Sequence, residues 1–84
     1  MNKIITNNLK EFRTEVGLRQ LDVACRLGFI STERISKWEK GLAFPSMFNL
    51  FKLAVIYNKL PHELYPEYFK NLILNNNIYC SENS

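Results

Sequence analysis

The chain has 84 residues, of which 46% are hydrophobic and 13% aromatic. It is too short for two ordinary domains and too apolar for a wholly disordered chain, so we expect one small folded domain with short tails. Its formal net charge of +3 is a mild bias toward polyanions that identifies no partner by itself. No apolar run approaches the ~18 residues of a membrane span and no signal peptide is apparent, so we expect a cytoplasmic protein with no membrane partner.

Side chains that could carry chemistry are few and scattered. The two cysteines, Cys25 and Cys80, form no CxxC pair, which excludes a zinc finger and a disulfide scaffold and predicts reduced thiols. The single histidine, His62, has no second ligand at metal-binding spacing. An enzyme would need titratable groups that converge in a pocket, and the sequence offers no such set. We therefore predict no catalytic residue, no metal and no cofactor.

Hydrophobic spacing predicts an all-α protein, because apolar residues recur at helical intervals and never alternate for long. The five predicted helices lie at 8–16, 20–27, 32–40, 47–57 and 61–65. The first three are each followed by a glycine that can end a helix in the left-handed conformation, namely Gly17, Gly28 and Gly41. Ser46 fits the N-cap of the fourth helix, and Pro61 suits the first turn of the fifth.

A further helix is predicted after Pro66, because apolar side chains fall on one side of this segment. They are Tyr68, Phe69, Leu72 and Ile73. The asparagine-rich ends of the chain have no period and are interpreted as tails. The predicted organisation is an N-terminal arm at 1–7, a helical domain at 8–66, a C-terminal helix at 67–75 and a flexible tail at 76–84.

The stretch from Gln20 to Gly41 has the layout of a helix-turn-helix unit, in which the second helix can enter a major groove of DNA. Ala24 is small where the two helices must cross, and Ser31 or Thr32 can cap the second one. The residues predicted to point inward are Val23, Leu27, Ile35 and Trp38. The polar residues left on the opposite side are Thr32, Glu33, Ser36 and Lys37.

Several motifs, in this order and spacing, resemble the Cro and phage-repressor type of helix-turn-helix regulator, also called the xenobiotic-response-element family. The motifs are Leu9 and Arg13 in the first helix, GLRQLDVACRLG, ISKWEKG, Pro45-Ser46, LFKLA and LPHELYP. The resemblance covers about residues 8–66. It implies a five-helix lambda-repressor-like domain, here with an extra C-terminal helix, whose third helix reads double-stranded DNA, usually from a homodimer. We therefore expect a bacterial or phage transcriptional regulator.

The resemblance also implies roles for individual residues. The base-reading positions are Thr32, Glu33, Ser36 and Lys37. Gln20 matches a position that holds a DNA phosphate. Arg34 and Lys40 flank the base-reading positions and are predicted to contact phosphate, and Arg19 is a further phosphate candidate. Arg13 and Glu39 match a pair that forms an internal salt bridge. By their chemistry, Lys37 suits guanine, Glu33 suits the cytosine amino group and Thr32 suits the thymine methyl group.

The sequence departs from the family pattern at two places. One residue more than the commonest spacing separates Gly28 from Trp38, which lengthens the turn near Phe29 to Ser31. Arg19 also stands where the family usually has a Ser or Thr that caps the second helix, so that cap is lost, although an arginine there can reach a phosphate.

The fourth helix and the loop before it contain more apolar residues than one buried face needs. They are Leu42, Phe44, Met47, Phe48 and Phe51. One interpretation is a thick core beneath Trp38, and the other makes Leu42, Phe44 and Phe48 part of a dimer contact. The apolar side of the C-terminal helix leaves the same choice between folding back and meeting a partner. An alternative function is therefore an antitoxin-like or adaptor module that binds another protein, with DNA binding secondary.

Overall fold

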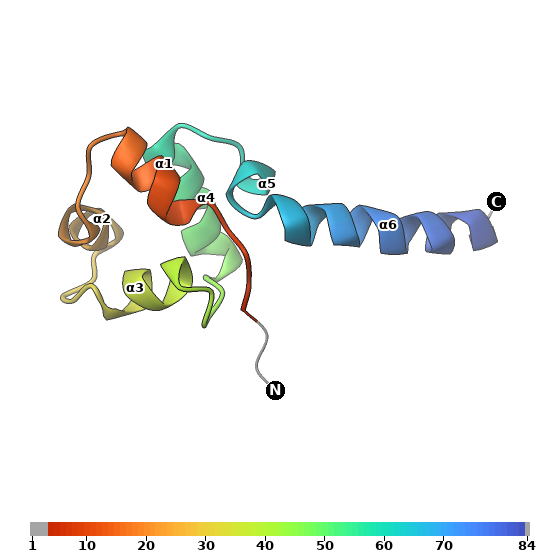
Figure 1. The fold of residues 1–84 in the computed structure, drawn as a ribbon, viewed down its shortest axis with the longest axis horizontal. Coiled ribbons are helices and arrows are strands. Elements are labelled where there is room, and N and C mark those ends of the chain that lie inside the picture. Colours follow the sequence, from red (N-terminus) through yellow and green to blue (C-terminus); the bar gives the residue numbers. More distant parts are fainter. Residues whose placement is uncertain (1–3, 84) are drawn as a thin grey trace.

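The computed structural model of this chain describes residues 4–83, with side chains up to position 75. All regular elements of this part are helices, so the all-α fold class is confirmed. They are α1 (Leu9–Glu15), α2 (Gln20–Leu27), α3 (Glu33–Glu39), α4 (Met47–Tyr57), α5 (Pro61–Leu64) and α6 (Pro66–Asn83). Helices α1 to α5 form a bundle, and α6 leaves it as a projecting rod (Figure 1). Within the described part, no helix is both long and apolar enough to cross a membrane.

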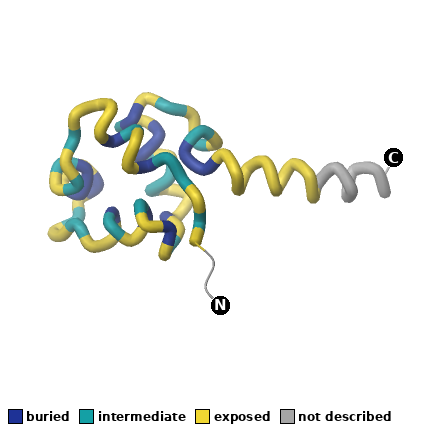
Figure 2. The backbone as a smooth tube through the Cα atoms, in the orientation of Figure 1, coloured by how far each residue is buried: buried dark blue, intermediate teal, exposed yellow. Residues whose placement is uncertain are grey.

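One core holds the five-helix bundle together, and each of these helices contributes to it. Its buried hydrophobic residues are Leu9, Val23, Ala24, Leu27, Ile35, Trp38, Leu53, Ala54, Tyr57, Leu64 and Tyr65. They follow the helical spacing of the sequence, and the four residues predicted to point inward are all among them. Buried segments alternate with exposed ones along the bundle, whereas residues 66–75 of α6 are exposed throughout (Figure 2).

The helix ends show how the sequence sets the boundaries. The Ser46 hydroxyl accepts a hydrogen bond from the backbone N–H of Asn49 and caps α4 as predicted. Pro61 occupies the first turn of α5. Thr32 precedes α3 without a side-chain cap, and the hydroxyl of Ser31 accepts a 3.4 Å bond from the N–H of Glu33 instead. Of the two capping candidates for α3, only Ser31 contacts the helix start.

The interpretation of the α4 aromatics as a thick core beneath Trp38 is wrong. Trp38 is buried against the ring of Phe29, whereas the apolar residues on the outer side of α4 and in the loop before it are exposed. These exposed residues are Leu42, Phe44, Met47, Phe48 and Phe51. The physical reason is helical geometry, because Leu53, Ala54 and Tyr57 already fill the side of α4 that faces the other helices.

Helix α6 is longer than the helix predicted at 67–75. Its backbone continues to Asn83, past the predicted end at residue 75, because the chain has no proline or glycine after Pro66 that would stop a helix. The side chains of the predicted flexible tail, 76–84, lie outside the described part, so its flexibility stays a prediction. Residues 68, 69, 72 and 73 are not buried by the bundle, because all four side chains stay exposed, although Tyr68 and Phe69 contact its edge.

The sequence pattern indicated that the N-terminal arm is a tail, but in the structure this arm is bonded to the bundle through Ile5 and Asn7. The backbone N–H of Ile5 donates to the carbonyl of Gly41 at 2.9 Å, and the Asn7 amide donates to the carbonyl of Trp38 at 3.0 Å. Asn8 adds a backbone bond to the carbonyl of Leu64. These bonds join residues far apart in the chain and leave no periodic pattern in the sequence. The arm therefore runs across the C-terminal end of α3 and fixes it to the bundle.

Candidate nucleic-acid interface

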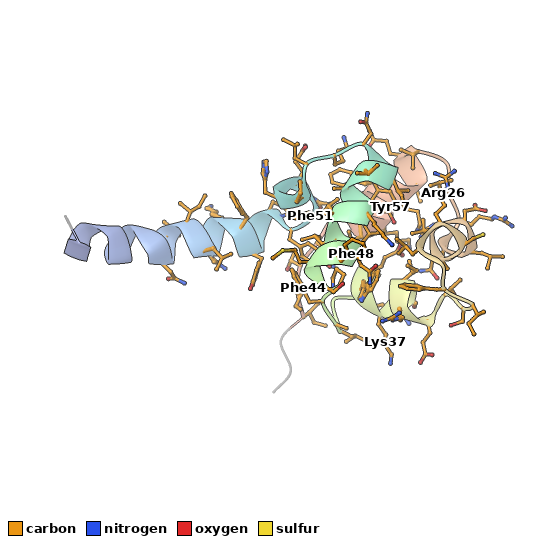
Figure 3. All side chains as sticks on the ribbon, turned by 180° about the vertical axis from the view of Figure 1, so that it is seen from behind. Arg26, Lys37, Phe44, Phe48, Phe51 and Tyr57 are labelled. Atoms are coloured by element: carbon orange, nitrogen blue, oxygen red, sulfur yellow. The ribbon has the colours of Figure 1, made fainter. Side chains whose placement is uncertain are left out.

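Helix α3 is attached to the bundle by one side and presents its other side to solvent. Ile35 and Trp38 are buried in the core. The exposed residues of the outer side are Glu33, Arg34 and Lys37, with Lys40 directly after the helix, while Thr32 and Ser36 are half-buried beside them. The positions assigned to base reading thus share one side of α3. Figure 3 shows Lys37 pointing away from the bundle below the α4 aromatics.

A buried ion pair anchors the C-terminal end of α3 to α1. Arg13 and Glu39 form the salt bridge implied for them, with 2.6 Å between Nε and Oε2 and 3.1 Å between Nη2 and Oε1. Their side chains are only 11% and 5% exposed. The hydrogen bonds to Glu39 raise the pKa of the Arg13 guanidinium against the opposing effect of burial. Arg13 also donates to the carbonyl of Leu18 at 3.0 Å, so the pair links α1, the α1–α2 loop and α3.

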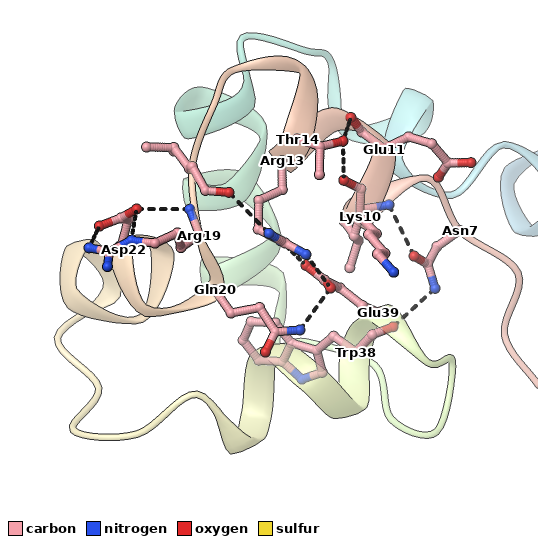
Figure 4. A network of polar contacts seen from close by, with 12 residues as sticks. Asn7, Lys10, Glu11, Arg13, Thr14, Arg19, Gln20, Asp22, Trp38 and Glu39 are labelled. Atoms are coloured by element: carbon pink, nitrogen blue, oxygen red, sulfur yellow. Dashed lines mark hydrogen bonds and ion pairs between the residues drawn. The ribbon is translucent and has the colours of Figure 1, made fainter.

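Gln20 belongs to the same network, although it was assigned to a DNA phosphate. Its side-chain N–H donates to Oε1 of Glu39 at 2.9 Å, which turns the amide toward the protein interior (Figure 4). One N–H of the amide and the backbone N–H groups at the start of α2 are not used in this bond. The structure therefore gives Gln20 a positioning role in the free protein, as a bridge from α2 to α3.

The start of α2 has a substitute for the cap that its sequence lacks. Oδ2 of Asp22 accepts a hydrogen bond from the backbone N–H of Arg19 at 2.8 Å, which is the reach-back half of a capping box. The guanidinium of Arg19 binds the same carboxylate in a bidentate manner, at 2.8 and 3.0 Å. These bonds with Arg19 lower the pKa of Asp22 to about 2. The Arg19 side chain is exposed, yet in the free protein it is paired with Asp22 rather than open to a phosphate.

Two of the proposed base-reading residues pair with each other on the surface of α3. Nζ of Lys37 lies 3.5 Å from Oε2 of Glu33, one helical turn away, and both side chains are exposed. An exposed pair at this spacing is worth only about 0.2–0.5 kcal/mol, so a ligand can separate it at little cost. The two residues were assigned to different bases and, in the free protein, partly neutralise each other.

Arg34 is held by the lengthened turn. Its guanidinium carbon lies 4.3 Å from the centroid of the Phe29 ring, and that ring meets Trp38 edge-on at 5.9 Å. A chain of contacts therefore runs from the core through Phe29 to an exposed cation. Ile30, at the tip of the same turn, is fully exposed. The turn thus places the Phe29 ring against one cation of α3 and exposes one apolar side chain beside the N-terminal end of this helix.

Sequence reasoning missed three residues that shape this surface: Asn7, Asp22 and Phe29. A signal existed for Asp22, because an acid three residues into a helix is the second half of a capping box. Phe29 precedes Arg34 by five positions across a turn, and Asn7 bonds to a residue 31 positions away. Neither of these contacts follows a helical interval, so neither leaves a pattern that could be read from the sequence.

The comparison with known protein families shows the class of this protein. A family model described as helix-turn-helix matches residues 9–64, two thirds of the chain. The chain belongs to this helix-turn-helix family. It is a DNA-binding transcriptional regulator of the Cro and repressor type, as the motifs of the sequence indicated. Searches of curated proteins and of solved structures found no match.

In this helix-turn-helix protein, the matched region contains α1 to α5 and ends where α6 begins. The DNA-reading unit of the family, α2 and α3, is the part that the Arg13, Gln20 and Glu39 network holds together. Helix α6 lies outside the matched region, so family membership assigns it no role.

Proposed function

We propose that the protein regulates transcription by reading a specific operator with the outer side of α3 in the major groove, as a homodimer. The observation that carries this proposal is the contrast between the two sides of α3. One side is fixed by Trp38, by the buried ion pair and by the N-terminal arm, while the other exposes charged and polar groups. A rigid helix with a free polar side suits base recognition, because its side chains need little further ordering on binding.

The proposed contacts divide into two kinds. Thr32, Glu33, Ser36 and Lys37 would contact base edges, where each good bidentate contact contributes about 1–3 kcal/mol of discrimination. The proposed phosphate contacts come from Arg34, which the Phe29 ring orients, and from Lys40 at the end of α3. Arg19 would have to exchange Asp22 for a phosphate, and Gln20 would use the backbone N–H groups at its helix start.

The test is a selection from a random DNA library with the purified chain, followed by the same selection with the double variant Glu33→Ala/Lys37→Ala. The wild type should enrich a near-palindromic sequence, and the double variant should lose preference at a few positions per half-site. Its thermal stability should change little, because the lost pair is exposed.

The matched control is Lys10→Ala/Glu11→Ala, which removes one charge of each sign from exposed positions of α1. This control should enrich the wild-type operator. A Glu33→Ala/Lys37→Ala variant that kept the full operator preference would refute the assignment of α3 as the reading helix.

A further inference from the structure

Helix α6 exposes an apolar face that its own bundle does not cover. Its apolar residues at positions 68, 69, 72 and 73 are each between two fifths and one half exposed. The first turn of the helix contacts the bundle, through Tyr68 beside Phe44 at 5.3 Å and Phe69 beside His62 at 5.1 Å. Most of the stability of a helix in a protein comes from packing of its apolar side. The half-exposed side chains of α6 therefore have apolar area left to bury against a partner.

Helix α4 carries a second apolar stripe that is also uncovered. Its residues follow the helical interval and are Met47, Phe48, Phe51 and Val55, of which Val55 is 81% exposed. A groove of about 430 Å³ runs along this stripe. Phe51 also lines a second hollow, which reaches Pro61, and Pro61 lines a third, which reaches Leu72 on α6. A series of adjoining hollows thus leads from the α4 stripe to the α6 face, and Figure 3 shows Phe44, Phe48 and Phe51 on the side of the bundle from which α6 projects.

The α6 of a chain does not reach its own α4 stripe. One residue, Tyr65, separates α5 from α6, and it is buried with its ring 4.6 Å from that of Phe44. Folding α6 back over Phe48 and Val55 would pull Tyr65 out of the core. An occupant of the α4 stripe would therefore come from another molecule.

Area and charge favour the α6 helix of a second copy as that occupant. At roughly 100 Å² per half-exposed large side chain, the α6 face offers about 400 Å² and the α4 stripe somewhat more. Neither reaches the about 800 Å² per partner of a stable interface alone, but both together do. Two α4 stripes facing each other would bring together the cations that line the α4 groove, Arg26 and Lys52. Helix α6 avoids this repulsion, because Glu82 is the single charged residue of the chain after Lys70.

We propose that two copies exchange their α6 helices, so that the α6 face of each copy packs on the α4 stripe of the other. This inference rests on the proposed homodimer and specifies how it forms. The exchange covers both apolar surfaces at once. It also makes each α6 a connection between the two α1–α5 bundles of the dimer. At about 1.5 Å per residue, the 18 residues of α6 span about 27 Å, longer than the 11 residues of α4.

The oligomeric state of the full chain without DNA gives the first test. Light scattering after gel filtration should give twice the chain mass for the wild type. Val55→Glu and Ile73→Glu should each give monomers, because each places a charge in the α6–α4 contact. Ile30→Glu makes the same change at a fully exposed position outside both surfaces and should remain a dimer. A wild-type chain that is monomeric at high micromolar concentration, or dimeric variants at positions 55 and 73, would overturn the exchange.

Cross-linking between labelled copies distinguishes the possible pairings. In a Cys25→Ser/Cys80→Ser background, one chain carries Val55→Cys and a second chain of different mass carries Ile73→Cys. The exchange predicts that a short thiol cross-linker joins position 55 of one chain to position 73 of the other in the mixture. Cross-links of 55 to 55 or 73 to 73 would overturn the exchange while leaving a homodimer. Base reading by α3 is measured separately on a single half-site, where Val55→Glu should keep the wild-type base preference.

Discussion

A few single residues fix the orientation of α3, the proposed reading helix. Glu39 receives bonds from Arg13 and Gln20 and is almost fully buried, so one carboxylate connects α1, α2 and α3. A buried pair of this kind contributes little net stability over apolar residues of the same volume, but breaking it leaves one charge buried and unpaired. Its role is therefore to position α3.

Replacing Glu39 by Ala should lower the free energy of unfolding by about 3–5 kcal/mol, because Arg13 is left without its partner. The double variant Arg13→Leu/Glu39→Leu should recover much of that loss, measured by urea denaturation. Glu15→Ala is the matched control, because Glu15 is exposed in its 3.7 Å ion pair with Lys59, and a pair of this kind is worth at most about 1 kcal/mol. A double variant as unstable as Glu39→Ala would contradict this explanation.

The hydroxyl groups of Tyr57 and Tyr65 are buried and have no hydrogen-bond partner among the described residues. Burial raises the pKa of both phenols above their usual value of about 10. The unfolded chain releases these protons as the pH rises above 10, whereas the folded chain holds them. The free energy of unfolding therefore does not change with the titration of these two phenols well below pH 10, and it should fall as the pH rises above 10.

Tyr57→Phe should raise the free energy of unfolding at pH 7 by roughly 1 kcal/mol, because it removes an unpaired buried hydroxyl. It should also reduce the loss of stability between pH 9 and pH 11, measured by urea denaturation at each pH. Tyr68→Phe removes a hydroxyl from an exposed side chain and should change neither quantity. A destabilised Tyr57→Phe variant would show that the hydroxyl has a partner in solution.

Phe29 should affect DNA binding through Arg34, which it orients. Because an exposed cation–π contact is worth about 0.5–1 kcal/mol, Phe29→Leu should weaken operator binding about two- to fivefold in titrations at fixed salt. In a double-mutant cycle with Arg34→Ala, the effect of Phe29→Leu should disappear. Equal effects of Phe29→Leu with and without Arg34 would assign the loss to the turn itself.

At the scale of elements, the N-terminal arm and α6 behave differently from what their composition indicated. The helices of the bundle were predictable, because Val23, Ile35 and Trp38 fall on one side of their helices and glycines follow them. The arm was not predictable, because its order comes from bonds of Ile5 and Asn7 to the distant end of α3. The direction of α6 was not predictable either, since it depends on the packing of Tyr65 and Tyr68 against Phe44, about 20 positions earlier in the chain.

The contact between the arm and Gly41 yields a prediction with an internal control. Gly17 and Gly41 have nearly the same left-handed backbone, with φ of +75° and +77°, which costs another residue roughly 1–2 kcal/mol. A Cβ on Gly17 would meet nothing within 4 Å, whereas one on Gly41 would lie 2.6 Å from the carbonyl oxygen of Ile5. Gly41→Ala should therefore be clearly more destabilising than Gly17→Ala in urea denaturation, and hydrogen exchange at Ile5 should become faster. Equal losses in the two variants would mean that the arm yields freely.

The sequence predicted part of the candidate site. The outward side of α3 follows from the helical spacing of its apolar residues, and the Arg13–Glu39 pair follows from the family resemblance. The pairs of Arg19 with Asp22 and of Lys37 with Glu33 lie at helical intervals, so the sequence carried a signal for both. The bond from Gln20 to Glu39 joins residues 19 positions apart, and only the three-dimensional arrangement shows it. The free protein thus holds several proposed DNA contacts in internal pairs.

At the scale of the whole molecule, the salt dependence of operator binding tests both the proposed phosphate contacts and the homodimer. Each phosphate contact adds about 0.9 to the slope of log affinity against log salt concentration. A homodimer carries every contact twice, so Lys40→Gln or Arg34→Gln should flatten the slope by about 1.8 on the full operator. On a single half-site with the monomeric Val55→Glu chain, the same substitutions should flatten it by about 0.9.

The control for this measurement is Lys59→Gln, which removes the same charge from a side chain paired with Glu15 and stacked on Phe12. Its slope should stay at the wild-type value, because counterions are released only where a cation meets a phosphate. If Lys59→Gln flattened the slope as much as Lys40→Gln, affinity would follow the net charge of the whole chain rather than individual contacts. Equal slope changes on the full operator and the half-site would instead place a single copy on the operator.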